Sequence, residues 1–139
     1  VGAVLTLVLT LGGGLAWLFA IASGLAAQPL LRDLALLIGP DQALVITGRW
    51  PDCRFANVCL WTRFSQMFDY VNRPVSRNRA NTQLEADGSF RMVIAHSDPG
   101  VPNWLDSEGR MYGSVFWRFF LPEGEIETPQ ATVVQWSDL

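Results

Sequence analysis

The sequence predicts a mainly β protein, an antiparallel β-sandwich that follows one transmembrane α-helix. Three observations lead to this prediction. The first 31 of the 139 residues carry no charged side chain, whereas charges are spread through the rest of the chain. From residue 43 onward, short β-type runs alternate with turn residues, which is typical of a sandwich or barrel. About 100 residues follow the apolar run, enough for one small domain with its own core.

The transmembrane helix is expected over residues 1–28. Residues 4–27 are rich in leucine, valine, alanine and isoleucine, and a run of this length crosses a hydrocarbon layer about 30 Å thick. A secretory signal peptide is the alternative, because it too is apolar and ends in small residues. The run exceeds the roughly 7–15 residues of a signal core, which favours a retained anchor.

Three consecutive glycines, Gly12, Gly13 and Gly14, lie in the middle of this span. In lipid, small residues let a neighbouring helix approach closely, which suggests a packing face for a partner subunit. Glycine is also common in transmembrane helices generally, so both interpretations stay open.

Residues 29–40 are expected to form a short interfacial helix and linker. Leu30, Leu34 and Leu37 recur at a spacing that suits a helix lying in the membrane interface. Gly39 and Pro40 then end the segment, because proline cannot continue a helix. The β-sandwich domain is therefore expected over residues 41–139.

Six apolar runs are predicted to be strands, and the clearest turn signal between them is Asp87-Gly88. Within the last long run, Arg118 is the only charged residue, and a buried guanidinium would need a carboxylate or carbonyl partner. The expected strands cover residues 43–47, 57–64, 82–85, 90–95, 114–121 and 131–136.

Composition narrows the possible functions. Ten arginines and no lysine, against thirteen acidic residues, give a net charge of −3. This balance argues against nucleic-acid binding, which needs a basic face. Six tryptophans and eight phenylalanines suit a β-rich core or an interface with membrane or protein. With two cysteines and one histidine the common four-ligand zinc sites cannot be assembled, so no metal or cofactor is expected.

Cys53 and Cys59 are the two cysteines. They can form a disulfide if the domain faces an oxidising compartment. Two half-buried free thiols are the alternative, because a separation of six residues does not fix their distance in space.

Several motifs after residue 83 resemble a known bacterial family. They are the Asp-Gly hairpin of residues 84–90, Asn103-Trp104-Leu105 in its loop, the strand that carries Arg118, a Thr-Pro pair and a final Val-Val strand. With them, residues 43–135 resemble the domain of unknown function 1214. The resemblance implies a jelly-roll-like antiparallel sandwich with a largely unassigned role, and it carries over no catalytic residues.

His96, Asp98 and Asp106 form the one candidate catalytic group, because a histidine near carboxylates is the usual material for acid–base catalysis. No nucleophile or metal set completes it. The favoured interpretation is structural: a turn at Asp98, an Asn103 that satisfies loop backbone groups, and a Trp104 that fills the sandwich.

Arg73, Arg77 and Arg79 form a candidate binding patch in a long connection, with Asn103 and Trp104 as further ligand or partner contacts. Such arginines can bind a carboxylate or a lipid headgroup, and exposed aromatic residues can bind sugars. The alternative is a solvated loop whose arginines pair with nearby carboxylates.

These observations favour a non-catalytic, single-pass accessory or scaffold subunit of a larger membrane complex. Its expected partners are other integral membrane subunits and the lipid bilayer. A membrane-anchored ligand-binding module is the alternative, and an enzyme component comes third. The possible disulfide and the absence of lysine-rich flanks lead us to expect an extracytoplasmic domain on a bacterial inner membrane.

Overall fold

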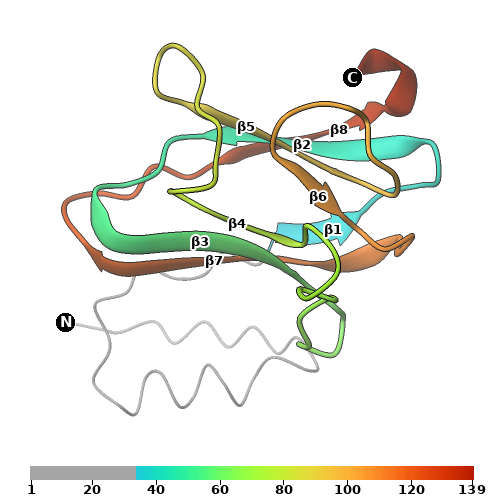
Figure 1. Ribbon diagram of the computed structural model, residues 1–139, viewed down its shortest axis with the longest axis horizontal. Helices are drawn as coiled ribbons and strands as arrows, with labels where there is room; N and C mark the ends of the chain where they lie inside the picture. The colour runs from blue at the N-terminus through green and yellow to red at the C-terminus, as the bar shows by residue number, and fades with distance from the viewer. Residues whose placement is uncertain (1–33) are drawn as a thin grey trace, which may run out of the picture.

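A computed structural model describes residues 34–139, which form two four-stranded β-sheets packed face to face (Figure 1). Sheet A has the strand order β1-β7-β3-β4, and sheet B has the order β6-β5-β2-β8. The elements are β1 (Leu34–Leu37), β2 (Gln42–Gly48), β3 (Cys53–Trp61), β4 (Ser76–Asn78), β5 (Phe90–Ala95), β6 (Trp104–Asp106), β7 (Tyr112–Pro122), β8 (Gln130–Gln135) and the 3₁₀ helix η1 (Trp136–Asp138).

The predicted mainly β, two-sheet architecture is confirmed, and five of the predicted runs coincide with β2, β3, β5, β7 and β8. The turn before β5 is also as predicted. Gly88 has a φ of +83° and donates to the carbonyl of Glu85, and the Glu85 N–H donates to Ser89. Residues 82–85, however, contribute only one bridge, between Leu84 and Phe90.

The helix expected over residues 29–40 is wrong where the structure describes it. Leu34–Leu37 is strand β1, which pairs antiparallel with β7 and places Leu36 opposite Gly113. Leu36 is fully buried, and pairing with a long strand outweighs the helical spacing of the leucines. The sandwich therefore begins before residue 41.

The predicted transmembrane helix of residues 1–28, with Gly12, Gly13 and Gly14, lies outside the described residues. Within residues 34–139, no helix has the length and apolar character needed to cross a membrane.

One strand pair is parallel, which corrects the expectation of a purely antiparallel sandwich. β6 runs beside β5 in the same direction, with Val93 opposite Trp104 and Ile94 opposite Leu105. The reason is the connection of residues 96–103, which returns the chain along sheet B so that β6 starts again at the same end as β5 (Figure 1).

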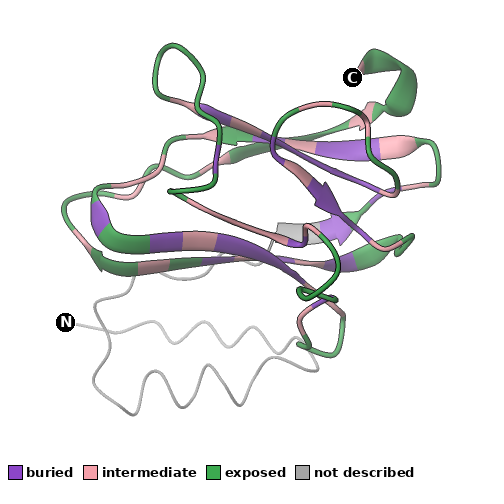
Figure 2. Ribbon diagram, in the orientation of Figure 1, coloured by how far each residue is buried: buried purple, intermediate pink, exposed green. Residues whose placement is uncertain are grey.

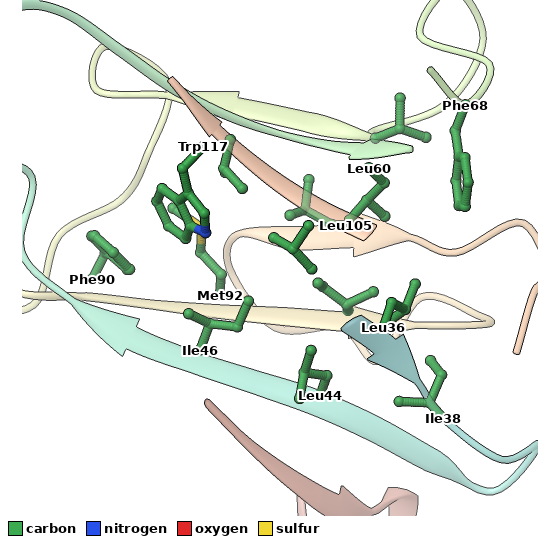
Figure 3. Close-up of a cluster of buried hydrophobic side chains, with 14 residues drawn as sticks. Leu36, Ile38, Leu44, Ile46, Leu60, Phe68, Phe90, Met92, Leu105 and Trp117 are labelled. Atoms are coloured by element: carbon green, nitrogen blue, oxygen red, sulfur yellow. The ribbon is translucent and has the colours of Figure 1, made fainter. Parts of the chain in front are cut away.

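The main core lies between the two sheets (Figure 3). Tryptophan and phenylalanine rings fill one end of it, where Trp50 lies 5.2 Å from Phe90 and 5.5 Å from Trp117 between ring centroids. Aliphatic side chains fill the remainder, since alternate residues of each strand point inward. The fully buried ones include Leu36, Ile38, Ile46, Val58, Leu60, Met92, Ile94, Leu105 and Val115.

A second, smaller cluster covers the outer face of sheet B. Ala43, Val93 and Ala95 are fully buried there. Partly buried side chains that pack on this cluster include Val101, Trp104, Val134 and Leu139. Within residues 34–139 no second cluster of this kind covers the outer face of sheet A, where Cys59 is buried but Leu37, Phe55, Tyr112 and Phe120 are exposed. Figure 2 marks the buried and exposed residues along each strand.

Candidate functional site

His96 follows β5 directly and joins three segments of the chain. Its Nε2 lies 3.0 Å from the carbonyl oxygen of Gly39, and its Nδ1 lies 2.7 Å from the Ser107 hydroxyl. A ring nitrogen that faces a carbonyl must donate, so Nε2 carries a proton, and in the neutral ring Nδ1 accepts from Ser107. Ser107 is fully buried, so its hydroxyl cannot reach a substrate and the pair acts as a structural bridge.

The two carboxylates expected beside His96 have other partners. Asp98 accepts the N–H of Gly100 and closes the predicted turn. Asp106 is buried, forms an ion pair with Arg73 and accepts the N–H of Glu108. The described part of the chain also contains no group of three His, Cys, Asp or Glu side chains that could hold a metal ion.

Two of the candidate arginines lie where the edge strands of the two sheets meet. The Arg73 Nη1 lies 2.7 Å from the Asp106 Oδ2, and the Asp106 N–H donates to the carbonyl of Pro74. Arg77 on β4 donates from Nη2 to the carbonyl of Trp104 on β6 at 3.1 Å. We call Arg73, Pro74, Arg77, Trp104 and Asp106 the seam, because their bonds tie sheet A to sheet B.

The seam also fixes the charge on Arg73. The hydrogen bond that Arg73 donates to Asp106, together with the negative charge of that carboxylate, raises the pKa of the Arg73 guanidinium. Arg73 is thus held as a cation by a protein carboxylate, which is the local pairing expected for a structural arginine.

Arg79 lies away from the seam. Its guanidinium donates to the carbonyl oxygens of Cys53, at 2.7 Å, and Pro51, at 3.3 Å. The three arginines therefore contact three separate sets of protein groups, and the structure does not gather them into one patch.

Asn103 has the structural role predicted for it. Its Oδ1 accepts the N–H of Gln83, and its Nδ2 donates to the carbonyls of Gln83 and Arg91, at 2.8 to 3.0 Å. Trp104 does not fill the main core as expected. It lies on the outer face of sheet B, where its indole Nε1 donates to Ala95, and its neighbour Leu105 points inward instead.

The disulfide alternative for Cys53 and Cys59 is wrong. Both are free thiols on the same strand, β3. Six residues of extended strand separate their Cα atoms by about 20 Å, whereas a disulfide requires less than about 7 Å. The expectation of an extracytoplasmic domain thus loses the support that a disulfide would have given it.

Both thiols should resist alkylation in the folded protein. Cys59 is fully buried, with the Trp61 indole nitrogen 3.2 Å from its sulfur, and burial raises the pKa of both thiols. Because the thiolate is the reacting species, iodoacetamide should modify each cysteine at least about tenfold more slowly in buffer than in urea. Peptide mass spectrometry measures this, and equal labelling of Cys59 in both conditions would contradict its burial.

Arg118 is exposed on the outer face of sheet A, so it needs no carboxylate partner. Its guanidinium carbon lies 5.3 Å from the centre of the Phe116 ring and 5.9 Å from that of Trp61. These two rings stack with centroids 4.1 Å apart. The arrangement places a cation against an aromatic pair, with water available to the guanidinium.

Further apolar side chains surround this pair on the same face. Leu37 is 65% exposed and Tyr112 lies opposite it, while Phe55 lies opposite Phe120. Arg118 is the only charged side chain in this group. We call the group the aromatic face, and it consists of Leu37, Phe55, Trp61, Tyr112, Phe116, Arg118 and Phe120.

A second uncovered surface, among residues 34–139, is the edge of sheet B at β8. Ala131 and Val133 lie opposite the core residues Ile46 and Leu44, yet both are exposed. Sheet A ends on this side with β1, which has only four residues. β8 itself contains no charged residue and no proline. Charged residues and proline usually protect an edge strand from pairing with another strand.

Two solved structures resemble this chain. An uncharacterized protein from Burkholderia cenocepacia matches 76% of it at 31% identity with a TM-score of 0.71. The VPA0106 protein from Vibrio parahaemolyticus matches 71% at 20% identity with a TM-score of 0.56. The matches cover 29% and 27% of those proteins, so this chain spans less than a third of their length. No protein-family model and no curated protein matches the chain.

Proposed function

We propose that this chain is a membrane-anchored, non-catalytic accessory subunit whose sandwich binds another integral membrane subunit through β8. The uncharged first 31 residues, which precede β1 closely in sequence, would serve as the anchor. The sandwich would then be held beside the bilayer, where neighbouring subunits are within reach.

The edge of β8, which pairs with no further strand among residues 34–139, is the observation that carries this proposal. An unpaired edge offers a row of backbone donors and acceptors, to which an extended segment can add as a further strand. Ala131 and Val133 would give that segment an apolar contact. Because β8 is uncharged, an added strand meets no charge repulsion from it. In both solved relatives the matched region is one part of a larger polypeptide, which fits a sandwich that packs against further protein.

The polar groups support this function over the two alternatives. Arg73, Arg77 and Arg79 are already bound to protein oxygens, which weakens the case for a headgroup-binding or sugar-binding module. His96 contacts a carbonyl and a buried hydroxyl, which weakens the case for acid–base catalysis.

We extend the proposal to family and location. The motifs that resemble the domain of unknown function 1214 support membership of this sandwich in that family. They also support a jelly-roll-like strand topology. Arg32 is the one basic residue among residues 28–48, which follow the apolar run, and this low positive charge supports a domain on the extracytoplasmic side of a bacterial inner membrane.

Val133→Lys should release the chain from its membrane complex. A charged side chain on the edge strand opposes the addition of another strand. In mild detergent extracts of native membranes, separated by native electrophoresis, the wild-type chain should migrate in a large assembly and the variant on its own.

Leu84→Lys is the matched control, because Leu84 is 47% exposed and Val133 is 45% exposed, on different parts of the domain. It should leave the assembly intact. If the wild-type chain migrates alone, or if the two variants behave alike, β8 is not the binding edge. Extraction at alkaline pH tests the anchor separately, because an anchored chain stays with the membrane pellet.

A further inference from the structure

We infer that the aromatic face of sheet A lies on the surface of an anionic lipid bilayer. This inference rests on the proposed membrane anchor, and it adds the orientation of the domain and the class of lipid that it contacts. β8 belongs to the other sheet, so a partner on β8 and a bilayer on the aromatic face do not compete.

The point at which the chain enters the domain favours sheet A as the membrane-facing sheet. The described domain begins with β1, the edge strand of sheet A, and Leu37 at the end of β1 is part of the aromatic face. If residues 4–27 span the bilayer, only residues 28–33 link the span to β1. Six residues reach at most about 20 Å, so sheet A must lie close to the headgroups.

The side chains of the aromatic face suit the membrane interface. Tyr112 combines an apolar ring with one polar group, and such residues concentrate at the boundary between lipid and water. Leu37, Phe55 and Phe120 add purely apolar surface that water covers poorly. Burying this surface among the headgroups would stabilise one orientation of the domain.

Charge distinguishes the two outer faces. On the aromatic face the one charged group is the Arg118 guanidinium, which attracts anionic phosphates. The outer side of sheet B instead mixes both signs: Arg91 on β5 with exposed carboxylates, among them Asp98 in the connection that follows β5 and Asp138 in η1 (Figure 1). Because no carboxylate belongs to the aromatic face, its one cation is free to attract an anionic surface.

Hydroxyl-radical footprinting of the full chain in vesicles tests this orientation. Tyr112 and Phe120 report on the aromatic face, and exposed Trp136 and Leu84 serve as internal controls on other parts of the domain. In vesicles with about 30% phosphatidylglycerol, oxidation of Tyr112 and Phe120 relative to the controls should be at least about fivefold lower than in neutral detergent. Arg118→Glu should remove at least half of this protection while leaving the urea midpoint unchanged.

The outcomes separate this inference from the anchor on which it depends. If Tyr112 and Phe120 stay reactive while the chain resists alkaline extraction, the face is not on the bilayer although the anchor stands. If Tyr112 and Phe120 are as well protected in detergent as in vesicles, at every protein concentration, the chain's own first residues cover the aromatic face. If this protection rises with the protein-to-lipid ratio, a second copy of the chain covers the aromatic face. Loss of the chain from the vesicles would overturn the anchor as well.

Discussion

Replacing Gly113 by alanine should lower the free energy of unfolding by about 3 kcal/mol, because the added methyl group overlaps a fixed atom. A Cβ at this position would lie 2.6 Å from the carbonyl oxygen of Trp61 and 3.4 Å from the Phe68 ring. That oxygen belongs to β3, which is paired with β7 along most of its length, so the backbone cannot move away without losing ladder hydrogen bonds. Urea unfolding followed by tryptophan fluorescence measures the loss.

Ser114→Ala is the control for this substitution. Ser114 is the next residue of β7 and is only partly buried, so its replacement should change stability by less than about 1 kcal/mol. If Gly113→Ala were equally mild, Gly113 could not lie against β3 in the register described here.

Replacing Asn103 by alanine should also cost about 3 kcal/mol. The substitution removes three hydrogen bonds of a buried side chain, each worth about 1 kcal/mol, and leaves the backbone groups of Gln83 and Arg91 without partners. Asn103 also has a φ of +58°, a conformation that asparagine tolerates better than alanine. Thermal and urea unfolding of the variant report the combined loss.

Asn103→Gly separates the two contributions. Glycine adopts a positive φ without strain but makes none of the side-chain hydrogen bonds. The glycine variant should therefore be destabilised by about 1 kcal/mol less than the alanine variant. Full wild-type stability in the glycine variant would show that the side-chain bonds contribute nothing.

The strands that could be predicted are those with a strong local signal. β5 matches its predicted range because alternating apolar residues follow an Asp-Gly turn. β1 was not predicted, since its leucines have helical spacing and only β7 makes the segment extended. β6 has three residues and pairs in parallel with β5. Nothing local marks a strand that short, because its direction depends on the path of the preceding connection.

The candidate sites divide in a similar way. The role of Asn103 follows from its side-chain chemistry within a turn-rich segment, and the sequence indicated it. Ser107 was missed because a single serine carries no signal until the fold places it beside His96. Strand alternation in β7 could have placed Arg118 on the opposite face from Trp117. Both faces of β7 carry apolar residues, however, so the sequence shows no alternation of apolar and polar side chains. The seam depends on contacts between distant segments, which no local pattern shows.

The seam makes the sandwich mechanically asymmetric. An ion pair and two hydrogen bonds link the sheets where β4 meets β6, whereas no side-chain bond joins β1 to β8 within residues 34–139. Residues 38–41 join β1 to β2 on that side, and the Trp136 N–H donates to the carbonyl of Asp41. β8 is nonetheless an edge strand with mostly exposed residues, so local opening of the described domain should begin at β8 rather than at the seam. The strand proposed to receive a partner should thus open at a lower free energy than the seam, so it can adjust its twist to an added strand while the Trp50–Phe90–Trp117 cluster stays packed.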